Sequence, residues 1–553
     1  MTYQPTQKDL NLRRIASALA GLLLALSFPR MEIAGLAWLA PGLLLFSTIG
    51  LPGRLAFQIG WIGGFVLSLV SMYWMNYMPV TGLPVLAWMA LSAYVAAYYG
   101  LWTCLANRLL RLKIEPDSTT SIGTFFTAIA ALPLRHRFLW ILFCASSWTG
   151  LEFIRGWFLT GYPWLQLGAT QYKLIPLIQV VSITGIPGLT FILAWFSVSL
   201  ISAMLTLAHA PNRRHRAWLE ILPPLVVIAA TFAWGTQRIR PQIASRNPPR
   251  SVKLALIQPS VPQTLIWDSK ESTNRFNRLL ELSRTALAAK PEILIWPEAA
   301  VPGLLRYDAQ VGRPILELAR EHGVWIICGS DDARFPEGAA EGSKPDYYNS
   351  AFLINPKGEL VTKYDKRRLV IFGEYVPLAR WLPFLKWFTP IQGGFQIGRE
   401  AVQFKMPELK AQASVLICFE DIFAWLARDA SQPETDFLIN LTNDGWFGES
   451  SQHWQHLIFA LFRSVETGRP LVRCTNNGIS CWIDPTGRIR GLTENKSKSV
   501  HAEGFKVISL PLPARDVLWE STPFQKHGDW FAWICVICVG AGMGISHLRD
   551  RRA

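Results

Sequence analysis

The sequence predicts a multi-pass α-helical membrane domain of eight helices, seven before and one after a polar α/β domain. Half of the 553 residues are hydrophobic and only 17% are charged. Mean hydropathy is +0.22, which is too apolar for an ordinary soluble protein. Strand-like and helix-like runs alternate from Ser251 onwards, as in an α/β domain. We therefore expect three parts: a membrane domain at 1–245, the polar domain at 246–525, and a last helix with its tail at 526–553.

Eight apolar runs are the candidate membrane helices. They occupy about 15–29, 34–50, 55–75, 83–107, 138–153, 187–208, 219–235 and 530–546. Several are shorter than the ~20 residues that a straight span needs. The segment 120–134 is also apolar, but it is short, contains Pro133 and lies between basic loops. We expect it not to span the membrane.

The distribution of basic residues predicts the orientation. Arginine and lysine gather before the first run, in alternate loops after it, and at the C-terminus, whereas the other loops carry only Arg30, Arg155 and Lys173. The positive-inside rule then places both termini in the cytoplasm and the polar domain on the opposite side. The net charge of +15 fits anionic lipid headgroups, and no nucleic-acid-binding motif accompanies it. Glu152 and Arg155, one helical turn apart, form either an interfacial ion pair or a functional site within the membrane.

Three strand ends in the polar domain carry chemical groups. The strand Ser414–Cys418 ends in a thiol, which is a nucleophile if a base lies nearby and a core cysteine otherwise. The strand Ile293–Trp296 leads to Glu298, a candidate general base in a pocket walled by tryptophan, or a helix N-cap. Lys366 lies at the end of a predicted hairpin. Its ammonium is a candidate for stabilising an oxyanion, and the alternative is a solvated basic turn.

Together these motifs resemble the nitrilase, or carbon–nitrogen hydrolase, superfamily. The matching motifs are W-P-E at Glu298, Y-x-K-x-x-L-V-x-F-G-E-Y at Lys366 and I-C-F-E at Cys418. The stretches F-G-E-Y-V-P, N-L-T-N-D-G-W-F-G and the late G-D-W are similar to one branch, the apolipoprotein N-acyltransferases of Gram-negative inner membranes. Ile371 and Phe419 depart from the family pattern, which often has Pro and Tyr there; the phenylalanine puts any hydrogen-bonding role at its position in doubt.

The resemblance implies a four-layer α-β-β-α sandwich and a catalytic triad of Glu298, Lys366 and Cys418. It implies Glu374 and Glu420 as supporting carboxylates, with structural ion pairing as the alternative. The implied substrates are a phospholipid acyl donor and a diacylated apolipoprotein acceptor, joined through a Cys418 thioester in ping-pong fashion without a cofactor. The implied location is the inner membrane with the catalytic domain in the periplasm, and we expect a monomer.

Two other functions stay open at this point. One is a membrane-anchored amidase or nitrilase-type hydrolase with water as the second nucleophile, and the other is a catalytically silent lipoprotein-binding protein. The aromatic stretch 378–390, with Trp381 and Trp387, predicts a lid that dips into lipid, or else a loop that covers the sandwich. Trp267 is a candidate wall of the acyl pocket, or a core residue.

The remaining histidines and cysteines point to structural roles. His453 and His456 lie three residues apart, but no cysteine or carboxylate joins them at ligand spacing, so we expect hydrogen bonding and no metal site. A disulfide between Cys474 and Cys481 stays open.

Overall fold

The computed structural model describes residues 5–79, 84–110, 122–239, 250–266, 268–335, 344–377, 381, 394–492, 499–514 and 520–552. The chain divides into two compact units. A helical unit comprises Met1–Asn76, Val85–Pro241 and Lys526–Ala553, and an α/β unit comprises Tyr77–Pro84 and Gln242–Gln525.

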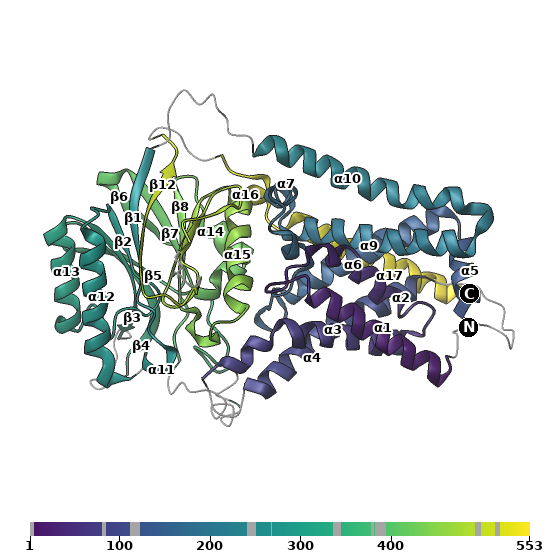
Figure 1. Cartoon of the computed structure of the whole chain (residues 1–553), viewed down its shortest axis with the longest axis horizontal. Helices are drawn as coiled ribbons and strands as arrows, with labels where there is room; N and C mark the ends of the chain where they lie inside the picture. Colours follow the sequence, from purple (N-terminus) through teal and green to yellow (C-terminus); the bar gives the residue numbers. More distant parts are fainter. Residues whose placement is uncertain are drawn as a thin grey trace. The chain divides into compact units, whose positions relative to one another are not determined.

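The helical unit consists of long apolar helices joined by short helical turns (Figure 1). The main helices are α1 (Gln7–Ala25), α2 (Ala40–Phe46), α3 (Gly53–Ser71), α4 (Pro84–Leu109), α5 (Ile122–Ala131), α6 (Leu134–Arg155), α9 (Ile186–His209), α10 (Ala217–Arg238) and α17 (Trp530–Arg552). Short helices α7 (Ile175–Ile178) and α8 (Val181–Thr184) precede α9.

Within the described ranges, five helices are long and apolar enough to cross a membrane. They are Gly53–Ser71, Pro84–Leu109, Ile186–His209, Arg214–Arg238 and Trp530–Leu548. Residues 125–131 and 134–155 pass the same test only as a pair bent by 109°, so α5 does not continue α6 in a straight line. The run 34–50 is broken into a 3₁₀ turn (Ala34–Trp38) and the seven-residue α2. Pro41 lies at the start of α2, where its missing N–H is tolerated. The count of eight membrane helices stays a prediction.

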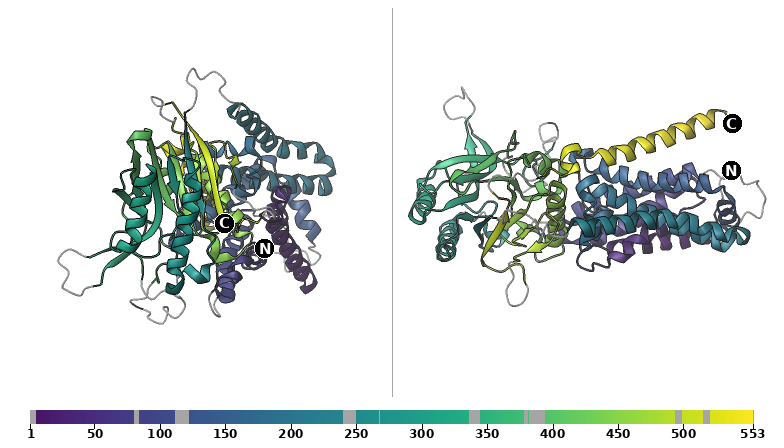
Figure 2. Two further views of the ribbon diagram at one scale, coloured as in Figure 1. Left: turned by 60° about the vertical axis from the view of Figure 1, so that its left-hand side comes forward. Right: turned by 90° about the horizontal axis from the view of Figure 1, so that it is seen from above.

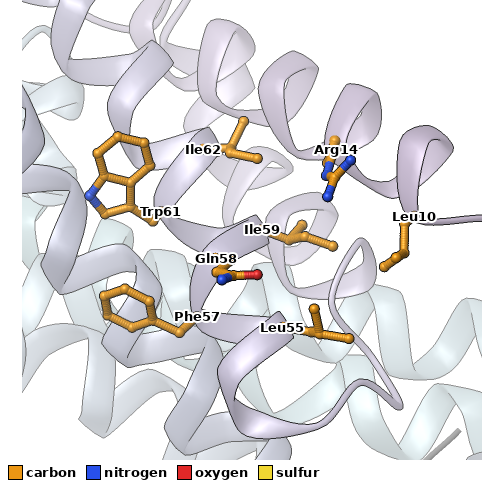
Figure 3. A pocket seen from close by; sticks show the side chains of 8 residues that line it. All are labelled: Leu10, Arg14, Leu55, Phe57, Gln58, Ile59, Trp61 and Ile62. Atoms are coloured by element: carbon orange, nitrogen blue, oxygen red, sulfur yellow. The ribbon is translucent and has the colours of Figure 1, made fainter. Parts of the chain in front are cut away.

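Helices α1 and α3 pack closely because small residues line their contact. A Cβ on Gly21 would lie 2.0 Å from the carbonyl oxygen of Gly63, so only glycine lets the two backbones approach. The same two helices line a pocket of about 420 Å³ in which Arg14 and Gln58 lie among apolar side chains (Figure 3).

The α/β unit contains two six-stranded sheets. The first has the order β12-β1-β2-β3-β4-β5 and the second β11-β10-β9-β8-β7-β6. The first sheet comprises β1 (Arg250–Gln258), β2 (Ile293–Ile295), β3 (Trp325–Arg334), β4 (Asp346–Ile354), β5 (Leu360–Asp365) and β12 (Gly504–Leu512). The second comprises β6 (Gln403–Met406), β7 (Ala411–Ile417), β8 (Phe437–Thr442), β9 (Leu471–Thr475), β10 (Cys481–Ile483) and β11 (Ile489–Arg490). In each sheet the three central strands are parallel and the outer strands antiparallel.

The two sheets face each other, and helices cover their outer faces (Figure 1), an order that the turned views keep (Figure 2). On the first sheet lie α12 (Ser272–Leu287) and α13 (Ala309–His322); on the second lie α14 (Ala424–Ala430) and α15 (Gln452–Thr467). Alternate residues of one strand enter different cores: Trp325 and Ile327 of β3 join the core between the sheets, and Ile326 and Cys328 the core beneath α12 and α13. This is the predicted four-layer α-β-β-α sandwich.

The strands predicted at Ile293–Trp296 and Ser414–Cys418 are present as β2 and β7. Strand β3 extends to Arg334, because its polar second half pairs with β4 over the whole stretch from Ile326 to Arg334. Strands β6, β10, β11 and β12 complete the sheets beyond the predicted set. The longer β3 matters for the site, since it brings further polar residues to the sheet end.

Candidate functional site

Cys418 lies at the point where strand β7 gives way to a 3₁₀ turn (Cys418–Ile422). Its φ is +54°, a left-handed conformation that costs a non-glycine residue of order 1–3 kcal/mol. The side-chain amide of Asn440 on β8 donates to the Cys418 carbonyl at 2.8 Å and holds the turn in place. The strained turn therefore places a partly exposed cysteine at the end of a buried strand.

Glu298 lies in the loop that follows β2, and a glycine on the neighbouring strand makes room for it. A Cβ on Gly329 would lie 2.4 Å from the Pro297 carbonyl oxygen and 2.7 Å from the Glu298 Cα. Glu298 is only 8% exposed. Its Oε2 accepts a hydrogen bond from the backbone N–H of Asn443 at 3.1 Å, which links the loop to the second sheet.

Lys366 follows β5 directly and is 1% exposed. Its ammonium donates to Glu298 Oε1 at 3.1 Å and to Glu374 Oε1 at 2.8 Å. The side-chain amide of Asn349 on β4 donates to the same two oxygens, at 2.8 Å and 2.9 Å. A lysine and an asparagine therefore bridge two buried carboxylates, and each polar group in this cluster has a partner, as burial requires.

Cys418 and Lys366 belong to different sheets and meet at the interface between them. The Lys366 ammonium lies 5.6 Å from the ring centroid of Phe419, the residue after the cysteine, within the range of a cation–π contact. Burial lowers the pKa of Lys366, but the carboxylates of Glu298 and Glu374 outweigh it and hold that pKa well above its ordinary value. The lysine is thus a fixed positive charge beside the thiol.

The Cys418 thiol rests in its protonated form. Burial, followed by the negative charge of Glu298, raises its pKa, while Lys366 and a hydrogen bond with Thr442 offset part of the rise. A thiol in this state becomes a nucleophile only when a base takes its proton. The carboxylate of Glu298, which contacts Lys366 and whose charge acts on the thiol, is the candidate for that base.

The two further carboxylates, Glu374 and Glu420, both hold backbone segments near the triad residues. Glu374 Oε2 accepts from the Val370 N–H at 2.8 Å, and its Oε1 accepts from Lys366. Glu420 accepts from the Ile417 N–H, just before the cysteine, at 2.8 Å, and from the Arg367 N–H, just after the lysine, at 2.6 Å. Burial raises the pKa of Glu420, and these hydrogen bonds offset part of that rise.

One predicted feature of the Glu298 site is wrong. Trp296 does not wall the carboxylate: it packs in the core beneath α12 and α13, and its indole N–H donates to Ser283 at 2.9 Å. Trp296 continues the alternation of β2, because it enters the same core as Leu294, whereas Ile293 and Ile295 enter the core between the sheets. The carboxylate is surrounded by polar donors instead, among them Asn349, which the sequence prediction missed because nothing in a single Y-N-S triplet marks it.

Behind the thiol lies a buried network of charges. His456 on α15 contacts Asp421 through Nε2 at 2.7 Å and Asp444 through Nδ1 at 2.8 Å. Arg473 on β9 donates to both carboxylates at 2.8 Å and to the Asn440 side chain at 2.7 Å. Burial and Arg473 lower the pKa of His456, but the two aspartates outweigh them and raise it. The histidine was expected to form structural hydrogen bonds, and it does.

The three tryptophans proposed for substrate contact are only partly placed. Trp381 is 77% exposed, as a residue that meets a partner or lipid would be. Trp267 and Trp387 lie outside the described residues. The lid and the acyl-pocket wall therefore stay predictions.

The remaining candidates have structural partners. Cys474 and Cys481 are free thiols, and the Cys474 Sγ lies 3.3 Å from the carbonyl oxygens of Ile257 and Ile295.

In the helical unit, Glu152 accepts hydrogen bonds from the Trp148 indole at 2.8 Å, the Leu167 N–H at 2.9 Å and the Thr190 hydroxyl at 3.0 Å. Arg155 donates to the Trp164 carbonyl at 2.6 Å. Both side chains thus fix the loop after α6, which favours the structural role over a functional one.

Comparisons with known proteins cover both units. The carbon-nitrogen hydrolase family model matches residues 253–502, and the apolipoprotein N-acyltransferase N-terminal domain model matches residues 20–199. The chain is similar to the apolipoprotein N-acyltransferase of Geobacter metallireducens, with 33% identity over 526 residues that cover 94% of this chain and 93% of the relative. The protein of that name from Vibrio cholerae is 30% identical over 98% of both chains. Among solved structures, an amidase from Nesterenkonia sp. is 17% identical with a TM-score of 0.34, covering 48% of this chain and 92% of that one.

Proposed function

The chain belongs to the apolipoprotein N-acyltransferase family, and we propose that it transfers an acyl chain from a phospholipid to the N-terminal α-amino group of a diacylglyceryl-cysteine on an apolipoprotein. The observation that carries this proposal is the buried contact of Lys366 with Glu298 at 3.1 Å, beside the strained Cys418 turn. A base, a fixed cation and a thiol in one place are what transfer through a thioester requires.

In the first half-reaction, Glu298 takes the Cys418 proton and the thiolate attacks an ester carbonyl of the phospholipid. The developing oxyanion is held by the Lys366 ammonium and the backbone N–H of Phe419. Glu298 returns the proton to the departing oxygen, and a lysophospholipid leaves. The acyl chain remains on the sulfur as a thioester.

In the second half-reaction, the acceptor's α-amino group attacks the thioester carbon and the C–S bond breaks. Glu298 passes a proton from nitrogen to sulfur, which restores the thiol. Because the lysophospholipid leaves before the acceptor reacts, the two substrates share one covalent intermediate and the kinetics are ping-pong. Glu374 and Glu420 position Lys366 and the strand end before Cys418.

The protein is a membrane enzyme with several apolar helices, and the finer topology is part of this proposal. Alternating basic loops favour cytoplasmic termini and a periplasmic catalytic domain in the inner membrane. The division into 1–245, 246–525 and 526–553 and a monomeric state complete it. The stretch around the exposed Trp381 then forms a lid at the lipid surface.

The test is an acyl-transfer assay with the purified full chain. The protein receives a phospholipid with a labelled acyl chain and a synthetic diacylated peptide with a free N-terminus. We expect the label on the peptide amine for the wild type and for Cys538→Ala, which removes an exposed cysteine, and none for Cys418→Ala. Release of free fatty acid without peptide labelling would favour an amidase-type hydrolase, and an unreactive Cys418 would favour a silent binding protein.

The lid is tested separately by Trp381→Ser. Loss of an interfacial anchor should slow turnover of phospholipid in vesicles more than turnover of a short water-soluble ester. Equal loss with both substrates would contradict the lid.

A further inference from the structure

A third carboxylate lies beside the cluster of Glu298, Lys366 and Glu374. Asp331 on β3 pairs directly with Asn349 on β4 in the antiparallel register, and side chains so paired have Cβ atoms about 5 Å apart on one face of a sheet. The Asn349 amide is the group that donates to both Glu298 and Glu374.

The alternation of β3 confirms the side on which Asp331 lies. Trp325 and Ile327 enter the core between the two sheets, so Asp331, an even number of residues further on, has the same orientation. The next residue, Asp332, points to the opposite face, where Arg306 and Lys363 form ion pairs with it. Asp331 therefore belongs to the face that carries the triad.

Asp331 differs from its neighbours in exposure. It is partly exposed, as Cys418 is, whereas Glu298, Lys366 and Glu374 are each buried. Unlike the carboxyl groups of Glu298 and Glu374, that of Asp331 is therefore accessible to an arriving substrate. The half-reactions described above assign it no task.

The charges around Asp331 set its proton affinity. Burial, then the negative charges of Glu374 and Glu298, raises the pKa of Asp331 to about 7, while Lys366 lowers it in part. The free α-amino group of a peptide has a pKa of about 7.7–8.0. The two groups are therefore closely matched, which is the condition for efficient proton transfer near neutral pH.

The second half-reaction has a proton that Glu298 does not account for. At neutral pH the acceptor arrives largely as an ammonium with three N–H bonds, which has no lone pair for attack. The amide product keeps one N–H, so two protons leave nitrogen. One returns through Glu298 to the sulfur of Cys418, and the other needs a second base.

We propose that Asp331 is that second base: it binds the acceptor's α-ammonium and takes its first proton. The inference rests on the proposed function. The Asp331 carboxylate accepts a proton from –NH₃⁺ and leaves –NH₂, whose lone pair forms the C–N bond as the C–S bond breaks. The second nitrogen proton passes through Glu298 to the sulfur, and Asp331 later releases its own proton to water.

The experiment separates the two half-reactions of Asp331→Asn. The acyl-enzyme is formed from labelled phospholipid, excess donor is removed, and loss of label from the protein is followed after the diacylated peptide is added. We expect acyl-enzyme formation within about twofold of wild type, and aminolysis at pH 7 about 10²-fold slower, the typical contribution of a general base. The defect should shrink towards pH 9, where the amine loses its proton to water.

Three controls distinguish catalysis from structure. Hydroxylamine, an amine that is uncharged at pH 7, should release the acyl chain equally fast from wild type and Asp331→Asn. Asp331→Glu, which keeps a carboxyl group, should restore much of the transfer. Asp346→Asn, an exchange of the same kind at the start of β4, should leave both half-reactions unchanged.

Three results would overturn the proposal: undiminished aminolysis at pH 7, an equal loss with hydroxylamine, or a loss of acyl-enzyme formation in Asp331→Asn. A wild-type acyl-enzyme that never acylates the peptide would instead refute the proposed function.

Discussion

Glu420 joins the segment before Cys418 to the segment after Lys366, and its replacement by glutamine tests that link. Its Oε1 accepts from the backbone N–H groups of Arg367 and Arg368 at 2.6 Å and 3.0 Å. Its Oε2 accepts from the Ile417 N–H and the Tyr364 hydroxyl, both at 2.8 Å. All four partners are donors, so the site is built for a group that only accepts.

Glutamine has the shape of the carboxylate but must place an NH₂ where one oxygen was. With the NH₂ towards residues 367 and 368, two backbone donors lose their acceptor. In the opposite orientation the tyrosine hydroxyl can turn and accept, and only the Ile417 N–H is left unsatisfied. One buried donor without a partner costs about 1–3 kcal/mol, although loss of the charge relieves part of the burial cost. We expect a net destabilisation of about 1–2 kcal/mol.

The effect on activity should exceed the effect on stability. Loosening the segments before Cys418 and after Lys366 moves the thiol relative to the ammonium, and a displacement of about 1 Å typically costs about 10²-fold in rate. The rate of acyl-enzyme formation and the unfolding temperature of Glu420→Gln are compared with those of Glu408→Gln, an exposed glutamate near β6. Unchanged stability together with an unchanged rate would refute this linking role of Glu420.

Three further predictions concern the buried charges. Lys366→Met leaves Glu298 and Glu374 without their counter-charge and should lower stability by about 3–5 kcal/mol, partly restored by adding Glu374→Gln; thermal unfolding at pH 7.5 measures both. His456 has a raised pKa, so its stabilising contribution is complete below about pH 6.5 and is lost as the pH rises through its folded value; His456→Gln should therefore cost more stability at pH 6 than at pH 9. Asp331, with a folded pKa of about 7, loses its stabilising contribution between about pH 4 and pH 7, so the stability of Asp331→Asn relative to wild type should rise over that window and be constant above it. If the stability difference between a variant and the wild type did not change with pH, the pKa shift assigned to that residue, His456 or Asp331, would be contradicted.

Two of the three strand ends could be predicted because a buried apolar run leads to one reactive side chain, Glu298 in one case and Cys418 in the other. Ile293–Ile295 and Val415–Ile417 are continuous apolar runs, as buried parallel strands are, and the polar residue that follows each marks the sheet end. Lys366 was found through its hairpin and its motif. Glu298 and Lys366 follow strands of one sheet and Cys418 follows a strand of the other, so strand pairing does not join the three, and only the family motifs predicted that they belong together.

The features that the sequence did not predict depend on the pairing register of strands and on strands with a polar composition. Asn349 and Asp331 lie opposite each other only because β3 continues through Gly-Ser-Asp-Asp, a stretch whose composition is typical of a loop. Strand β12 was missed for a different reason: it contains Pro511, which argues against a strand. It is an edge strand that pairs with β1 alone, and an edge strand tolerates proline. The tryptophan at 296 was misplaced because its face of the strand was not considered.

The proposed mechanism depends most on Cys418 as the site of a covalent acyl intermediate. The direct measurement is mass spectrometry of the purified protein after incubation with phospholipid and no acceptor. We predict one acyl chain on the peptide that contains Cys418, removed when the diacylated peptide is added and absent in Cys418→Ala. An acyl chain on a different residue, or an undiminished adduct in Cys418→Ala, would contradict it.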